Sequence, residues 1–235
     1  MKGNYKGGYM GKILCVDLSN RKISKAELPS NDVLRKYIGC WGLGLKYLYD
    51  MLPPGYTATD SENPMVFMTA PLTGLPLPGA TNITLATKNF DTGFTVGYDG
   101  FIITGKSEEP VYLWIHEGKA ELRGAKHLWG KTDTHETEDV IQNELGSHKI
   151  SVAAIGPCGE NLVAGGAIMN DKNHGFCHSG GGTVMGSKNL KAIAVFGEMK
   201  IPVADADKLS SLKKEWMGDR LKHSGNTGWS IMRNQ

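Results

Sequence analysis

The 235-residue chain carries 26 basic and 24 acidic side chains, a formal net charge of +2, and 40% hydrophobic residues. This composition is ordinary for a globular protein with a sizeable core, and the evenly spread charges argue against nucleic acid or a membrane surface as a partner. The chain has no apolar signal region and no apolar window long enough to span a bilayer, so we expect a cytoplasmic protein.

The four cysteines argue against several metal and redox frameworks. None of them forms a C-x-x-C pair, so the sequence predicts no zinc knuckle, ferredoxin-type cluster motif or disulfide framework. They are Cys15, Cys40, Cys158 and Cys177.

The first predicted elements are a β-hairpin and two helices. Residues 11–19 and 22–29 read as paired strands. Ser30 is expected to cap a helix whose apolar face carries Val33, Leu34, Tyr37 and Ile38. The glycine-rich stretch 39–44 is expected to break that helix, and residues 45–52 then form a second one that ends at the prolines 53–54.

The rest of the chain is rich in strands. Strands are expected at 65–71, 81–88, 101–105, 149–156 and 191–197, with a hairpin at 111–124 that turns at Glu117 and Gly118. Residues 132–145 read as a helix with a capping box between Asp133 and Glu136, and residues 205–223 read as a last helix. Hairpins outnumber regular βαβ alternation, so the sequence predicts an α+β fold.

One glycine-rich run, HGFCHSGGGTVMGSKNLK at 174–191, invites several interpretations. A Walker A loop requires Lys and then Ser or Thr after its last glycine, but here Ser187 precedes Lys188. His174, Cys177 and His178 offer metal ligands, with Cys158 as a fourth. Alternatively, the backbone N–H groups of residues 180–182 form a nest that binds phosphate, or the glycines simply pack closely on a strand.

Other polar residues suggest no catalytic group. Glu136, Glu138 and Asp139 fall on the predicted helix and are expected to be solvated. The isolated histidines are expected to have structural or surface roles; they are His116, His127 and His135.

Blocks in a fixed order along residues 7–229 carry a resemblance to a known family. They include IGPCGENLVAGGAIMND (155–171), VMGSKNLKAIAVFG (184–197), YIGCWGLGLKYLYD (37–50) and NPMVFMTAPLTG (63–74). Taken in their order along the chain, these blocks resemble the N-terminal domain of the aldehyde ferredoxin oxidoreductase family, the tungsten-pterin oxidoreductases.

The resemblance implies a cofactor and a division into domains. Family members bind tungstopterin, in which tungsten or molybdenum is held by the dithiolenes of two pterins and Mg links the pterin phosphates. By this resemblance, residues 1–203 form the cofactor-binding domain, and residues 204–235 are the helical start of a following domain that is truncated or absent. Helical domains beyond it, or a partner subunit, would supply the ligands of a 4Fe-4S cluster.

The implied reaction oxidises an aldehyde to a carboxylic acid, with ferredoxin as electron acceptor. We expect this chain to be incomplete without the helical iron–sulfur domains, and the sequence leaves a homo-oligomer open. The alternative is a non-catalytic pterin- or phosphate-binding module, or a scaffold subunit that pairs with a full-length relative.

Residue by residue, the resemblance implies a cofactor site with fewer arginines than the family has. Arginines of the family correspond to Asn82, His174, His178 and Trp41, and its main-chain contacts correspond to Gly175 and Cys177. Gly180, Gly181 and Gly182 complete the expected phosphate-side loop. A short glycine-containing segment of the family is also missing between residues 94 and 97.

Overall fold

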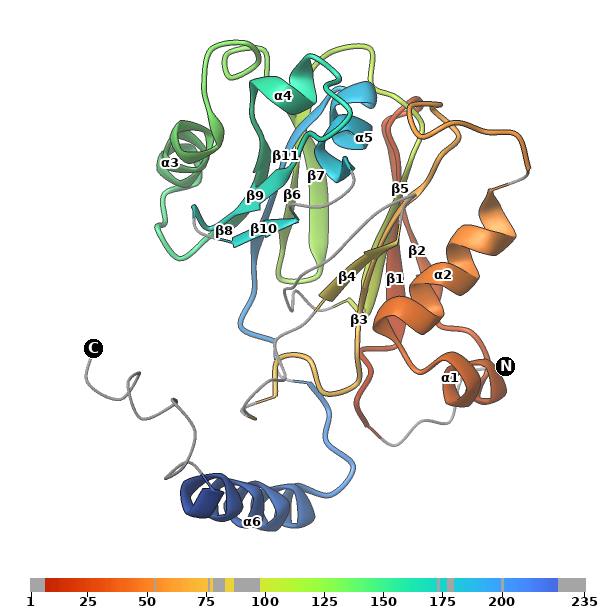
Figure 1. Ribbon diagram of the computed structural model, residues 1–235, viewed down its shortest axis with the longest axis vertical. Coiled ribbons are helices and arrows are strands. Elements are labelled where there is room, and N and C mark those ends of the chain that lie inside the picture. The colour runs from red at the N-terminus through yellow and green to blue at the C-terminus, as the bar shows by residue number, and fades with distance from the viewer. Residues whose placement is uncertain are drawn as a thin grey trace.

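Two β-sheets pack face to face in the computed structural model of the chain (Figure 1). The structure describes residues 7–52, 54–75, 77, 83–86, 98–172, 174–176, 180–199 and 201–223. The N-terminal sheet has the strand order β2 (Lys22–Glu27), β1 (Lys12–Asp17), β5 (Gly100–Thr104), β3 (Met65–Thr69) and β4 (Ile83–Ala86). The C-terminal sheet has the order β10 (His174–Phe176), β9 (Ile168–Asn170), β8 (Ser151–Ile155), β11 (Leu190–Phe196), β6 (Val111–His116) and β7 (Lys119–Gly124).

Helices cover the outer faces of both sheets. The helices α1 (Asn31–Tyr37) and α2 (Cys40–Met51) lie on the N-terminal sheet, and α3 (Thr134–Leu145) lies on the C-terminal sheet (Figure 1). Two short helices, α4 (Pro157–Glu160) and α5 (Gly181–Ser187), pack on each other, and α6 (Ala206–His223) follows the last strand. No helix in the described part of the chain is long and apolar enough to cross a membrane.

Alternating side chains of the strands explain this layered arrangement. In β1, Leu14 and Val16 face the layer between the sheets, whereas Ile13 faces α1 and α2. In β11, Ile193 faces the layer between the sheets and Ala194 faces α3. Because successive side chains of a strand point to opposite faces, each sheet can fill the shared layer and still hold a helix on its other face.

Hydrogen bonds between the sheets fix which edges lie together. Arg21, in the β1–β2 turn, donates to the carbonyl of Leu122 in β7, and Lys25 of β2 donates to the carbonyl of Gly118 in the β6–β7 turn. The β2 edge of one sheet therefore meets the β7 edge of the other. In aligned sheet packing the opposite edges, β4 and β10, then also share one side of the molecule.

Most predicted elements are confirmed. The α+β fold, the first hairpin and the 111–124 hairpin are present, and the helices predicted at 132–145 and 205–223 are α3 and α6. The Asp133 side chain accepts a hydrogen bond from the N–H of Glu136, and the Glu136 side chain accepts one from the N–H of Asp133, as a capping box requires. The domain boundary at residue 203 stays a prediction.

Two predictions about the N-terminal helices were wrong. The stretch 39–44 was expected to separate two helices, but α2 begins at Cys40 and contains the rest of that stretch. The break lies one step earlier, at Ile38, whose φ of 61° cannot continue α1. Ser30 precedes α1 as predicted, but its side chain makes no capping hydrogen bond.

One glycine contact in this fold gives a direct test. A Cβ atom at Gly186 would lie 1.9 Å from the carbonyl oxygen of Gly159, so Gly186→Ala requires the backbones of α4 and α5 to move apart. We expect Gly186→Ala to lower the free energy of unfolding by about 2 kcal/mol or more, measured by urea denaturation. Gly165→Ala is the matched control, since a Cβ there meets nothing within 4 Å. Equal effects of the two substitutions would contradict this account.

Candidate functional site

The predicted glycine loop is held against the segment that follows β8. A Cβ at Gly180 would lie 2.3 Å from the carbonyl oxygen of Ala164, and a Cβ at Gly182 would lie 2.3 Å from that of Ala167. Gly180 also adopts a φ of 82°, which favours glycine. These positions therefore need glycine for packing, whatever else the loop binds.

Hydrogen bonds at the start of α5 show which backbone donors are already used. The N–H of Gly182 donates to the carbonyl of Gly166 at 2.8 Å, and the N–H groups of Thr183 and Val184 donate to the carbonyl of Gly180. Among the described residues, no acceptor is found for the N–H of Gly181. The N–H of Gly182 is therefore not available to a ligand, and the predicted nest of three N–H donors loses one of them.

The other predicted site residues lie beside this loop or outside the described residues. His174 and Gly175 belong to β10, the edge strand of the C-terminal sheet, and the His174 side chain is exposed. Asn82, Cys177 and His178 fall outside the described residues. Asn82 directly precedes β4 in the sequence, and β4 is the edge strand of the other sheet.

The hairpin of β9 and β10 is anchored from behind. Asp171 in its turn accepts hydrogen bonds from the hydroxyl of Ser151, the N–H of Val152 and the side-chain amide of Asn170. The next residue, Lys172, donates its N–H to Glu138 of α3 at 3.0 Å. Asp171 and Lys172 both have positive φ angles, 44° and 59°, and these contacts hold that costly turn in place.

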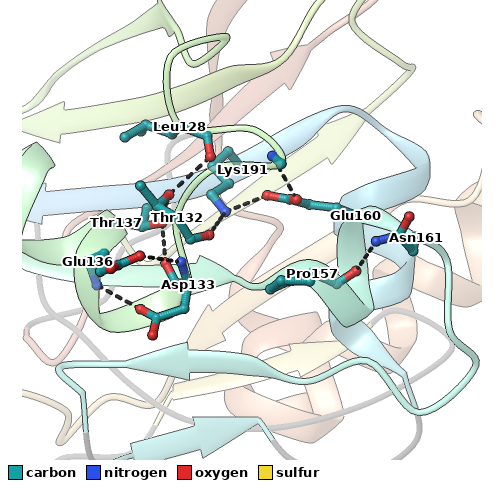
Figure 2. Close-up of polar contacts among 10 residues, drawn as sticks. Leu128, Thr132, Asp133, Glu136, Thr137, Pro157, Glu160, Asn161 and Lys191 are labelled. Atoms are coloured by element: carbon teal, nitrogen blue, oxygen red, sulfur yellow. Dashed lines mark hydrogen bonds and ion pairs between the residues drawn. The ribbon is translucent and has the colours of Figure 1, made fainter.

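A buried ion pair supports the short helix on which the glycine loop packs (Figure 2). Lys191 of β11 pairs with Glu160 at the end of α4, and their side chains are 0% and 3% exposed. Lys191 also donates to the carbonyl of Thr132 at 3.0 Å, and Glu160 accepts from the N–H of Gly130 at 2.9 Å. The loop before α3 and the helix α4 are therefore joined through one pair of charges.

Lys188, the lysine of the Walker A interpretation, is directed away from the glycine loop. Its buried ammonium donates to the carbonyls of Ser61 and Gly105, at 2.9 and 3.1 Å. Burial lowers the pKa of Lys188 to about 8, an effect that the nearby Glu62 carboxylate partly opposes. Lys188 therefore links the C-terminal sheet to loops of the N-terminal sheet.

The acidic side chains of α3 were predicted to be solvated, and for Glu138 this was wrong. Glu138 is only 7% exposed, because its carboxylate receives the Lys172 N–H and the side-chain amide of Gln142. Burial, and secondly the charge of Asp171, raise the pKa of Glu138. Helical periodicity did not reveal this role, because the partner lies in a hairpin that the sequence did not predict.

The metal-site alternative rests mainly on residues outside the described part of the chain. Within the described residues, no three His, Cys, Asp or Glu side chains are grouped so as to hold a metal ion. Cys177 and His178 lie outside the described residues, and Cys158 is exposed on α4. The zinc interpretation thus stays untested.

The described residues form an α+β domain of two sheets, in which the glycine loop leads into the buried helix α5. The family model of the aldehyde ferredoxin oxidoreductase N-terminal domain matches residues 13–197. The chain belongs to this family.

Named relatives agree with that assignment. The chain is 38% identical over 223 residues to the tungsten-containing aldehyde ferredoxin oxidoreductases of Thermococcus kodakarensis and Pyrococcus furiosus, covering 88% of this chain and 36% of each relative. It is 35% identical over 236 residues to an aliphatic sulfonate oxidoreductase, WOR-like subunit, of P. furiosus, covering 88% of this chain and 38% of that subunit.

A solved structure shows the same fold. The BamBC active-site complex of benzoyl coenzyme A reductase, determined with 1,5-dienoyl-CoA, superimposes with a TM-score of 0.88 at 33% identity. The match covers 94% of this chain and 36% of that one. The chain therefore spans little more than a third of the relatives that it matches.

The lowered pKa of Lys188 predicts a pH-dependent stability. In the unfolded chain this lysine stays protonated to about pH 10.5, whereas in the fold it loses its proton near pH 8. Between these values the unfolded state binds more protons, so stability should rise with pH, by up to about 3 kcal/mol across the window. We expect the unfolding free energy of wild type to rise relative to that of Lys188→Met between pH 8 and pH 10.5. A difference that stays constant would argue against a buried, titrating lysine.

The Lys191–Glu160 pair predicts an unequal response to single and double substitution. Glu160→Leu leaves the Lys191 ammonium buried without its carboxylate and should cost about 3–5 kcal/mol of stability in urea denaturation. Glu160→Leu combined with Lys191→Met removes both charges, so we expect it to be more stable than the single variant. If the losses of unfolding free energy from the two single substitutions add up in the double variant, the two charges do not stabilise each other and the prediction is wrong.

Proposed function

We propose that this chain is the N-terminal cofactor platform of a tungsten- or molybdenum-dependent bis-pterin oxidoreductase. In the whole assembly the substrate is an aldehyde, the product is the carboxylic acid, and ferredoxin accepts the electrons. The helical domains that carry the 4Fe-4S cluster come from further sequence or from a partner subunit. Within this proposal the 235-residue chain alone binds part of the cofactor and does not complete the reaction.

The observation that carries the proposal is the family match through the glycine loop. It runs from β1 to the end of β11 and includes both sheets, the loop and the helix that follows it. Relatives that are 38% identical to this chain over 223 residues are named tungsten-containing oxidoreductases. A match that also extends through the predicted site supports the same type of ligand here.

Donors at and near the β10 edge fit an anionic group such as a pterin phosphate. His174 offers an exposed imidazole, and Gly181, itself buried, has a backbone N–H without an acceptor among the described residues. Asp171, the carboxylate nearest to His174 in sequence, accepts two hydrogen bonds from β8 and one from Asn170 of β9. An anion at this edge therefore faces donors, and the adjacent negative charge is already compensated.

In this proposal the residues of the chain bind and orient the cofactor. Gly181, His174 and His178 hold the phosphate side, and Asn82, Gly175 and Cys177 complete the contacts around it. Mg linking the pterin phosphates belongs to the same proposal. When bound, the tungsten centre supplies the redox chemistry of aldehyde oxidation.

A second candidate function follows from the missing arginines. Asn82, His174, His178 and Trp41 replace residues that would make two parallel hydrogen bonds to phosphate, and each replacement weakens anion binding. One relative is itself described as a WOR-like subunit. A non-catalytic subunit that holds a pterin or another phosphate ligand beside a full-length partner is therefore the alternative.

Cofactor analysis tests the proposed function. The protein would be purified from its native host grown with tungstate, and tungsten would be measured by mass spectrometry and pterin by fluorescence after oxidation. We expect tungsten and pterin to copurify with the chain, and His174→Gln to lower both several-fold while the melting temperature stays unchanged.

His116→Gln is the matched control, because that histidine belongs to β6 in the interior of the sheet order, away from the β10 edge. A folded chain that carries pterin without tungsten would favour the binding-module alternative. A folded chain with neither group would refute the proposal.

A further inference from the structure

One buried acceptor in the β9–β10 hairpin has no hydrogen-bond donor among the residues that the structure describes. Asn170, the last residue of β9, is only 6% exposed. Its side-chain oxygen Oδ1 is one of two buried polar side-chain atoms without a partner among the described residues. An unsatisfied buried carbonyl oxygen costs free energy. A donor that reaches Oδ1 when a ligand binds would remove this cost.

The orientation of this amide is fixed by its neighbour. The Nδ2 group of Asn170 donates to Oδ2 of Asp171 at 2.9 Å. Because the Asp171 carboxylate can only accept when ionised, the nitrogen must be the atom on its side. The free atom of the amide is therefore the acceptor oxygen, and an exchange of the two atoms would put two oxygens together.

The sheet register shows where that oxygen lies. Asn170 pairs with Ala153 of β8 on one side and with His174 of β10 on the other. Paired residues of neighbouring strands project from the same face, and Ala153 belongs to the core between the sheets. Asn170 and His174 therefore project together from the inner face, where β10 forms the edge.

The hairpin that carries both residues is held rigidly. Its turn is bonded to α3 through Glu138, Asp139 and His135, which contact the N–H, the ammonium and the carbonyl of Lys172. Directly opposed side chains of a strand pair lie within reach of each other. In this register the His174 imidazole is the side-chain donor directly opposite Asn170 on β10.

We propose that Asn170 is a positioning residue for His174. In this structure its Oδ1 has no partner among the described residues; when the ligand binds, it accepts a hydrogen bond from one ring N–H of His174, and the second ring nitrogen then faces the phosphate group of the ligand. This inference rests on the proposed function and adds the residue that orients its histidine. A neutral amide that can only accept at this atom leaves the ring free to donate on the ligand side.

A double-mutant cycle tests the pair with inorganic pyrophosphate plus Mg²⁺ as the probe. Affinity would be measured by calorimetry for wild type, Asn170→Leu, His174→Gln and the double variant. We expect each single change to weaken binding about tenfold, the size of one hydrogen bond to a charged group. The double variant should bind no worse than either single variant, because both remove the same arrangement.

Nitrogen NMR of the His174 ring gives a second measurement. With pyrophosphate and Mg²⁺ bound to wild type, we expect one ring N–H to be protected and one tautomer to dominate, and in Asn170→Leu we expect both features to disappear. Asn170→Thr keeps an acceptor oxygen on a side chain suited to a strand, so it should retain most of the affinity and the protected N–H.

Asn63→Leu is the matched control for folding. Asn63 is likewise buried with an unpaired Oδ1, but it lies in the loop before β3 and donates to the carbonyl of Ala58. Its substitution should lower stability without changing pyrophosphate affinity. Additive effects of the two site substitutions, an unchanged His174 ring in Asn170→Leu, or no pyrophosphate binding by wild type would each overturn the positioning role. Tungsten and pterin content tests the proposed function separately.

Discussion

The apolar layer between the two sheets is the constraint on which the rest of the structure depends. Both sheets contribute every second side chain to it, and α5 adds Val184 and Met185. Since the inner faces are filled by this contact, the longer helices α1, α2 and α3 pack on the outer faces. Among the described strands, β4 and β10 are the edges at one side of this layer, and the glycine loop packs against residues 164–167, which precede β9.

The charges buried behind this edge face protein groups. Lys191 and Glu160 neutralise each other, Asp171 is saturated by donors, and Lys188 is held between carbonyls. Taking such groups out of water is costly, and their partners must be well placed to compensate. The benefit is a hairpin and a loop with fixed backbone positions, which a ligand bound partly through main-chain N–H groups requires.

More of the fold than of the candidate site could be predicted from the sequence. Strand alternation and the capping box at Asp133 are local signals, so they were readable along the chain. The β9–β10 hairpin was missed because each strand has three residues and its turn is stabilised by Asp171 and by Glu138 of α3. Likewise, the glycines around α5 looked like a phosphate nest, but their close contacts with Ala164 and Ala167 are tertiary and leave no mark in the motif.

The division of the strands has a consequence for how two molecules could interact. All five strands of the N-terminal sheet precede Gly105, and all six of the C-terminal sheet follow Pro110. A short connection thus joins two contiguous halves that bury each other, which is the arrangement that permits domain swapping. Lys188 and Asn189 bond this connection at the carbonyls of Gly105 and Ser107. These hydrogen bonds hold the connection against the C-terminal half of the same chain, and so favour packing of the two halves within one molecule.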